Sequence, residues 1–137
     1  MFKTKMLLTG LLLNTAISAC AFAASNPLSV HVLNLQNGLP SAGVNVILEK
    51  QEGEKWVQIS NGMTNEQGRI SALYPTESTM DKGSYRVTFK TGEWFDKHNT
   101  PTFFPEIPVI FKADGSVPHY HIPLLVSPYG FSSYRGN

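Results

Sequence analysis

The strongest constraint on the fold is a hydrophobic alternation of period two that runs along most of the chain. In residues 29–35, Val30 and Val32 alternate with His31 and Leu33. The alternation returns in residues 43–50, 56–59, 69–74, 85–89, 105–111 and 120–126. Successive side chains of a β-strand point to opposite faces of a sheet, so each segment is predicted to be a short strand.

Turn signals separate these segments, among them Asn37-Gly38, Glu52-Gly53 and Ala113-Asp114-Gly115. We take Asn61-Gly62 as the end of the run that begins at Trp56. Short strands with turn signals every 8–12 residues or so are typical of a β-sandwich. The sequence therefore predicts an all-β, antiparallel two-sheet sandwich of seven to eight strands.

Three segments carry more specific predictions. Pro105 and Pro108 place the strand over 105–111 at a sheet edge, because proline cannot donate a ladder hydrogen bond. Residues 76–82 are the one stretch expected to hold a helical turn, and residues 91–102 are predicted to be a long loop.

Composition excludes several classes of protein. Only 15% of the 137 residues are charged and the formal net charge is +1, with no basic run. This balance excludes a disordered chain and predicts neither a nucleic-acid partner nor an anionic membrane surface. The single cysteine excludes a disulfide framework and any multi-cysteine metal site.

Residues 1–23 are predicted to be an export signal and residues 24–137 the mature domain. Lys3 and Lys5 precede an apolar run too short to span a membrane, and Ala21-Phe22-Ala23 matches a small-x-small cleavage site. The alternative is a lipoprotein whose Cys20 is lipidated. Cleavage after Ala23 removes Cys20 and leaves a mature chain without thiols, which suits an oxidising compartment.

Histidines are the side chains best suited to chemistry in this sequence. His119 and His121 lie two apart in a predicted strand and should share one face, roughly 6.5–7 Å apart along the chain. His31 lies on the face of the first strand opposite Val30. The three imidazoles can meet only if the first and last strands are neighbours or if two subunits contribute. His98 lies in a polar segment and is expected at the surface.

Two kinds of chemistry fit three histidines. Neutral imidazoles can hold zinc with an open position for water, or they can deprotonate water directly while an arginine holds the substrate. No carboxylate lies near His119 and His121 in the sequence to orient a ligating histidine, which weighs against zinc.

The C-terminal segment is unusually aromatic for a chain end. Residues 127–137 contain Tyr129, Phe131 and Tyr134 together with Arg135. Chain ends are commonly frayed and polar, so this tail is predicted to pack on the sandwich or against another subunit.

Several motifs together resemble the transthyretin-like 5-hydroxyisourate hydrolases. They are His119-Tyr120-His121-Ile122-Pro123-Leu124-Leu125, Ser127-Pro128-Tyr129-Gly130 and Tyr134-Arg135-Gly136, with residues 28–34, 64–69 and 103–108 in support. The resemblance covers residues 27–137. Transthyretin hormone carriers of the same family lack the Tyr-Arg-Gly ending and the pair of histidines two residues apart.

The resemblance implies a transthyretin-like sandwich that forms a homotetramer with active sites between subunits. It assigns catalysis to His31, Arg69 and His121, and substrate binding to His31, Arg69, His119, Tyr134 and Asn137. No cofactor and no metal are implied. The reaction would open the ring of the purine-derived substrate 5-hydroxyisourate, a small molecule, during urate breakdown to allantoin. The location would be the periplasm, with no membrane partner after signal removal.

Two points stay open at the level of sequence. The family commonly ends in Tyr-Arg-Gly-Ser, whereas this chain ends in Asn137, whose amide cannot act as a serine-type nucleophile. Water activated by a histidine remains available as the nucleophile. The alternative function is a non-enzymatic transthyretin-like protein that binds an aromatic ligand between subunits.

Overall fold

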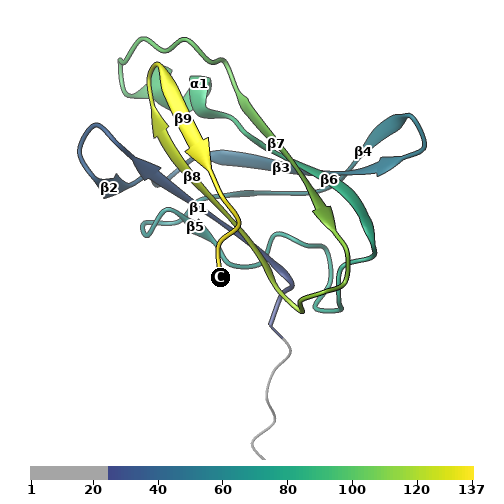
Figure 1. Ribbon diagram of the computed structural model, residues 1–137. Helices are drawn as coiled ribbons and strands as arrows, with labels where there is room; N and C mark the ends of the chain where they lie inside the picture. The colour runs from purple at the N-terminus through teal and green to yellow at the C-terminus, as the bar shows by residue number, and fades with distance from the viewer. Residues whose placement is uncertain (1–24) are drawn as a thin grey trace, which may run out of the picture.

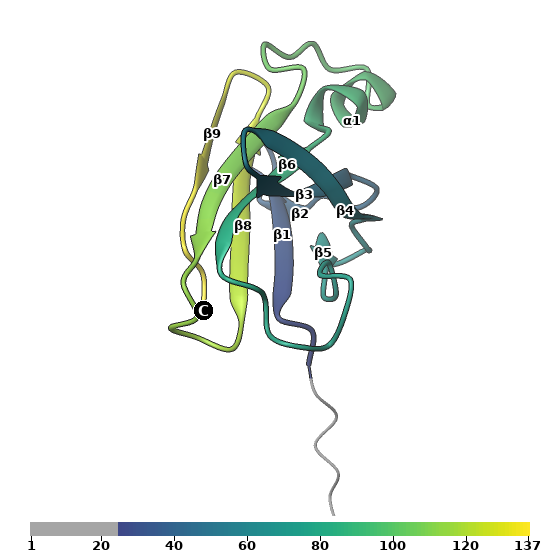
Figure 2. The ribbon, with the colours of Figure 1, turned by 90° about the vertical axis from the view of Figure 1, so that its right-hand side faces the viewer.

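The computed structural model describes residues 25–137. The predicted export signal and Cys20 lie outside these residues. The described chain forms two packed β-sheets and one short helix, which confirms the all-β sandwich (Figures 1 and 2). No helix in residues 25–137 combines the length and apolar character needed to cross a membrane.

Each sheet is built around a long central strand pair. One sheet has the order β2-β1-β8-β9, with β5 also paired to β1, and the other has the order β4-β3-β6-β7. The first comprises β1 (Leu28–Asn34), β2 (Leu39–Pro40), β5 (Arg69–Ile70), β8 (Tyr120–Ser127) and β9 (Gly130–Ser133). The second comprises β3 (Asn45–Glu52), β4 (Lys55–Met63), β6 (Gly83–Phe89) and β7 (Ile107–Ala113). As Pro105 and Pro108 predict, β7 is an edge strand that pairs only with β6.

The core lies between the sheets and consists of the inward half of each alternating strand. Val30 and Val32 of β1 face Val46, Val87 and their neighbours, and all four are fully buried. The outward half of β1, which includes His31, is only half-buried. The alternation therefore separates the side chains that stabilise the fold from those that remain free for chemistry.

One strand pair departs from the predicted antiparallel arrangement. β1 and β8 run parallel over their whole length, with Ser29 opposite His121 and His31 opposite Pro123. All other strand pairs among the described residues are antiparallel. The parallel pair joins the first and last long strands of the domain at the centre of one sheet, an arrangement that alternation within each strand does not reveal.

The prediction that Asn61-Gly62 ends a strand is wrong. β4 continues to Met63, and Gly62 pairs with Val46. A Cβ atom at Gly62 would lie 3.2 Å from the Ile70 side chain. Glycine therefore serves close packing at this position, one of the uses of glycine inside strands.

The prediction of a loop over 91–102 is wrong for its first half, where helix α1 spans Thr91–Lys97. Trp94 and Phe95 are buried against the sandwich, and the Trp94 indole donates a 2.7 Å hydrogen bond to the Ala42 carbonyl. Gly92 passes so close to Pro105 that a Cβ atom would lie 2.4 Å from its carbonyl oxygen. Tertiary contacts stabilise this helix, which is too short for a periodic pattern.

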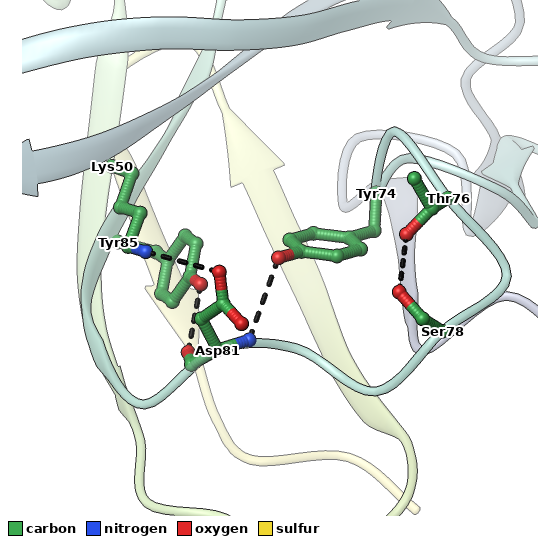
Figure 3. Close-up of polar contacts among 6 residues, drawn as sticks. All are labelled: Lys50, Tyr74, Thr76, Ser78, Asp81 and Tyr85. Atoms are coloured by element: carbon green, nitrogen blue, oxygen red, sulfur yellow. Dashed lines mark hydrogen bonds and ion pairs between the residues drawn. The ribbon is translucent and has the colours of Figure 1, made fainter.

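The helical turn predicted over 76–82 is also absent. Two tyrosine hydroxyls bind the backbone of this loop instead (Figure 3): Tyr85 donates to the Asp81 carbonyl at 2.7 Å, and the Asp81 N–H donates to Tyr74 at 3.4 Å. Lys50 adds an ion pair with the Asp81 carboxylate at 3.3 Å. The side chains of neighbouring elements thus satisfy polar groups that a helix would satisfy internally.

The tail packs on the sandwich, as predicted, by forming β9 next to β8 (Figure 1). Beyond β9, the Gly136 N–H donates to the His121 carbonyl at 2.9 Å. The aromatic side chains of the tail nevertheless stay at the surface, with Tyr129 72% exposed, Phe131 43% and Tyr134 58%. Backbone pairing, rather than ring burial, holds the tail in place within this subunit.

Candidate active site

The parallel pairing of β1 with β8 creates a polar cluster on the outer face of the sheet. Ser29 and His31 alternate with the buried valines of β1, and His121 alternates with the buried apolar residues of β8. The register places Ser29 directly opposite His121. The last residue before β8, His119, joins them from the same side.

Hydrogen bonds link three members of this cluster. The Ser29 hydroxyl oxygen lies 2.9 Å from His119 Nε2 and 2.7 Å from His121 Nδ1. The other ring nitrogen of His119, Nδ1, lies 2.9 Å from the Asn26 carbonyl oxygen. His119 and His121 therefore converge as the sequence predicts, with Ser29 as the bridge between them.

Arg69 reaches the cluster through β5. In the antiparallel β1–β5 pair Arg69 lies opposite His31. The preceding turn is held by the Asn65 side-chain oxygen, which accepts from the N–H groups of Gln67 and Arg69, each at 3.0 Å. Gly68 is required there because its φ is +70° and a Cβ atom would lie 2.5 Å from the Val32 carbonyl oxygen.

Arg69 presents a free positive charge to the cluster. It is exposed, and none of the ion pairs within residues 25–137 involves it. Since no carboxylate of residues 25–137 forms an ion pair with the guanidinium, its donors remain available to an anionic or carbonyl-rich ligand.

Burial and the nearby arginine both favour uncharged histidines. Burial, followed by the charge of Arg69, lowers the pKa of His31 below 6.5, although a backbone hydrogen bond to Gln67 acts in the opposite direction. The pKa of His121 is lowered by burial, by Arg69 and by the other two histidines, against a backbone hydrogen bond to Ser29. Both imidazoles are therefore neutral near pH 7 and can accept a proton.

The tail covers one side of His121. A Cβ atom at Gly136 would lie 2.5 Å from His121 Cδ2, so any larger residue would displace the ring or the tail. Asn137 follows directly and is exposed. Tyr134 lines a cavity of about 330 Å³ between β7, β8 and residues 133–135. Of the predicted site residues, only Tyr134 and His121 line this cavity.

The structure thus brings His31, Arg69, His119 and His121 together in one subunit, with the tail residues beside them. His98 lies elsewhere, stacked on Trp94 at a centroid distance of 3.9 Å. Sequence reasoning missed Ser29 and the contact of Gly136 with His121. Ser29 could have been found from its position two residues before His31, on the same face of the strand.

No set of three or more His, Cys, Asp or Glu side chains within residues 25–137 is arranged to hold a metal ion. The zinc alternative therefore gains no support from the donor geometry of the described residues. The cluster offers neutral histidines, His31 and His121, that can act as a base beside Arg69, which has no ion-pair partner within residues 25–137.

Comparison with known proteins agrees with the fold. A profile of the HIUase/Transthyretin family matches residues 28–136. The chain is 48% identical to the 5-hydroxyisourate hydrolase of Salmonella typhi, over 98% of this chain and 99% of that protein. It is 32% identical to the mouse 5-hydroxyisourate hydrolase, over 82% of this chain and 97% of that protein.

Solved structures of both branches of the family resemble this one. The 5-hydroxyisourate hydrolase of Klebsiella pneumoniae superposes with a TM-score of 0.70 at 36% identity, covering 80% of this chain and 98% of that one. Sea bream transthyretin in complex with thyroxine has a TM-score of 0.75 at 29% identity, covering 80% and 94%. The family match over nearly the whole described chain and the identity to full-length relatives lead to one conclusion: this chain belongs to the HIUase/Transthyretin family.

Proposed function

We propose that this protein hydrolyses 5-hydroxyisourate by opening its cyclic amide, a step of urate degradation. The observation that carries the proposal is the convergence of two neutral histidines, His31 and His121, with the unpaired Arg69. Two relatives named 5-hydroxyisourate hydrolase match 98% and 89% of this chain. The residues of the cluster suit the reaction without a covalent intermediate.

Water is the nucleophile in the proposed mechanism. His121 takes a proton from water as the oxygen attacks the amide carbonyl carbon, and His31 orients that water. A positioned general base contributes about 10²–10⁴-fold to such a step. The proton then passes from His121 to the departing nitrogen as the C–N bond breaks, which returns the histidine to its neutral form.

Arg69 supplies the electrostatic part of the mechanism. Its planar fork of N–H donors binds the carbonyl oxygens of the substrate and stabilises the negative charge that develops on the attacked oxygen. The absence of a carboxylate partner for Arg69 within residues 25–137 supports this role, because an ion pair would compete with the substrate.

The tail residues Tyr134 and Asn137 complete the substrate site in this proposal. Tyr134 contributes an aromatic wall, and Asn137 hydrogen-bonds the substrate or the attacking water. An amide can donate and accept hydrogen bonds, so the mechanism tolerates Asn137 at the position where the family commonly has serine. Asn137 has no hydroxyl, and the proposed mechanism needs none, because water is the nucleophile.

The proposed assembly is a homotetramer with the sites at subunit interfaces. Support comes from the apolar surface at the open side of the sandwich, which we define as the side formed by the edge strands β7 and β9. There Ile110 of β7 is 62% exposed and Phe131 of β9 is 43% exposed. A second group, Leu35 and Leu39, is 51% and 59% exposed beside β2. Pairing of the edge strands between subunits and burial of the two leucines would remove these apolar side chains from water.

The proposed location is the periplasm, on the basis of the export signal predicted over residues 1–23.

The test is to follow 5-hydroxyisourate made in place from urate by uricase, with EDTA present. The mature protein should accelerate the decay of the intermediate beyond its spontaneous rate. His121→Ala should abolish the acceleration, whereas the matched control His98→Ala, which removes a histidine outside the cluster, should preserve it. Decay at the spontaneous rate with the wild-type protein would contradict the proposal.

Asn137→Ser separates two explanations of such a failure. Rescue by this variant would show that the terminal residue limits activity. No rescue would favour the alternative function, a non-enzymatic binding protein for an aromatic ligand. Loss of activity on adding EDTA, with recovery on adding zinc, would favour the metal-dependent alternative.

A further inference from the structure

We propose that Ser29 is a positioning residue that fixes the tautomer of His121. Through its hydroxyl, Ser29 keeps the proton of the neutral imidazole on Nδ1 and leaves the lone pair on Nε2. The catalytic consequence of this inference rests on the proposed hydrolase function. The tautomer itself can be measured without any substrate.

The first step concerns His119 and a backbone carbonyl. His119 Nδ1 lies 2.9 Å from the oxygen of Asn26, and a carbonyl oxygen can only accept a hydrogen bond. His119 Nδ1 must therefore carry a proton. In the neutral ring the other nitrogen, Nε2, is then an acceptor.

Ser29 transmits this constraint from His119 to His121. His119 Nε2 lies 2.9 Å from the Ser29 oxygen, and because this nitrogen accepts, the hydroxyl must donate to it. A hydroxyl has one proton, so Ser29 cannot also donate to His121. At 2.7 Å from the same oxygen, His121 Nδ1 must be the donor.

The third step gives the consequence for His121. With its proton on Nδ1, which lies 2.7 Å from the Ser29 hydroxyl oxygen, the ring carries its lone pair on Nε2, and no side chain within residues 25–137 forms a hydrogen bond with Nε2. Nε2 is thus the nitrogen able to take a proton from water. The direction of the whole chain of hydrogen bonds follows from the Asn26 carbonyl at its far end.

The hydrogen bonds of His119 also indicate a different role for this residue. The resemblance places His119 among the substrate-binding residues, but both of its ring nitrogens are engaged within the subunit, with Asn26 and Ser29. His119 therefore acts through Ser29 on His121 rather than on the substrate. A histidine suits this position because it accepts at one nitrogen while it donates at the other.

The first experiment reads the tautomers directly. Long-range ¹H–¹⁵N NMR spectra of the mature protein at about pH 8, above the usual histidine pKa, distinguish protonated from unprotonated ring nitrogens. His31→Gln and His98→Gln variants assist assignment. We expect the Nδ1–H form for His119 and for His121 in the wild type. In Ser29→Ala, His119 should keep that form and His121 should gain the Nε2–H form.

The second experiment measures catalysis. Loss of an outer partner of a functional histidine commonly costs about 10–100-fold in activity, so kcat of Ser29→Ala should fall in that range. Its KM should stay within about twofold, because Ser29 does not touch the substrate. Ser29→Thr retains the hydroxyl and should restore both kcat and the His121 tautomer. Ser127→Ala, which removes a different serine hydroxyl of the same sheet, serves as the control and should change neither.

His119→Ala tests the same chain of hydrogen bonds from its other end. It removes the acceptor for the Ser29 proton, so we expect a fall in kcat with little change in KM. A large rise in KM with kcat unchanged would instead assign His119 to substrate binding and contradict its place in this chain.

Two results would overturn the inference: an Nε2–H form of His121 in the wild type, or a pure Nδ1–H form that persists in Ser29→Ala. Neither depends on 5-hydroxyisourate. If the tautomers follow the prediction but the protein does not hydrolyse that substrate, the proposed function fails and the role of Ser29 stands. The reverse pattern, hydrolysis with the wrong tautomer, rejects the role of Ser29 alone.

Discussion

Arg69 differs in its surroundings from the three cationic side chains that form ion pairs within residues 25–137. Lys50, Arg86 and Lys90 each lie next to a carboxylate, whereas Arg69 faces two histidines from the β1–β5 pair. After burial, the charge of Arg69 is the second cause that lowers the pKa of both imidazoles. In the proposed mechanism, Arg69 therefore acts both on the base and on the substrate.

Arg69→Lys should consequently lose far more activity than its retained charge suggests. A lysine presents a point charge in place of a planar fork, so two aligned hydrogen bonds are lost. Removal of a single donor to a developing oxyanion costs about 10²–10³-fold in kcat, and we expect a loss near 100-fold. Steady-state kinetics alongside circular dichroism tests this, and turnover within about threefold of wild type with unchanged folding would contradict the role of the fork.

The lowered pKa values of His31 and His121 predict how the protein responds to acid. Activity that needs neutral histidines should persist below pH 6.5 and disappear only as pH falls through the lowered values. The stability of the fold should also decrease as pH falls. The unfolded chain binds protons from about 6.5 downward before the folded chain does, so the free energy of unfolding decreases as pH falls through that window.

NMR titration of the histidine ring protons checks this prediction without substrate. In Arg69→Gln the titration midpoints of His31 and His121 should move upward, because one cause of their lowering is gone. Midpoints that stay in place would show that Arg69 does not act on the two imidazoles.

Among individual residues, the sequence predicted correctly those positions that follow from the alternation of side chains along a strand. The outward position of His31 and the common face of His119 and His121 follow directly from the two-residue period of a strand. Ser29 and Gly136 were not identified, because their roles depend on contacts across strands. No pattern within β1 indicates that Ser29 lies opposite His121.

At the scale of elements, the tail after β9 acts as a cover on His121. It is held there by the hydrogen bond from the Gly136 N–H to the His121 carbonyl, and only glycine leaves space for the ring. Gly136→Ala should therefore displace the imidazole or the tail. We expect at least a tenfold loss of kcat, of the size found when an outer partner of a functional histidine is lost.

Thermal unfolding should barely change in the same variant, since residue 136 follows the last strand and contributes little to the core. Gly130→Ala is the matched control: a Cβ atom there meets only the Ser127 hydroxyl, at 3.7 Å. Equal activity of Gly136→Ala and wild type would show that the tail does not control the position of His121.

Elements were predictable where alternation is regular. β1 and β8 were located correctly, since alternation over seven or eight residues is a strong signal, whereas β4 continues through a glycine that was taken as its end. Helix α1 and the loop before β6 were assigned wrongly. The first depends on burial of Trp94 and Phe95, and the second on tyrosine hydroxyls that replace backbone partners. Both are tertiary effects that a local pattern does not contain.

At the scale of the whole molecule, the open side of the sandwich carries two unpaired strand edges, β7 and β9, with exposed apolar side chains along them. A second copy could extend both sheets there. Ile110→Glu should prevent this by introducing a charge where an apolar contact forms, without disturbing the core, because Ile110 points outward.

Light scattering after gel filtration should therefore report a smaller species for Ile110→Glu than for wild type. The control is Lys55→Glu, a charge change on an exposed residue of β4 at the opposite edge. A wild-type protein that is already monomeric, or an Ile110→Glu variant that keeps the wild-type mass, would contradict the proposed use of this surface.

The parallel β1–β8 pair determines when the polar cluster can form during synthesis of the chain. Ser29 and His31 meet His121 only after nearly the whole domain has been synthesised, because β1 and β8 lie at its two ends. The polar cluster therefore assembles only after β8 has been made, late in synthesis of the domain. A change to residues 134–137 should act first on His121, which Gly136 contacts.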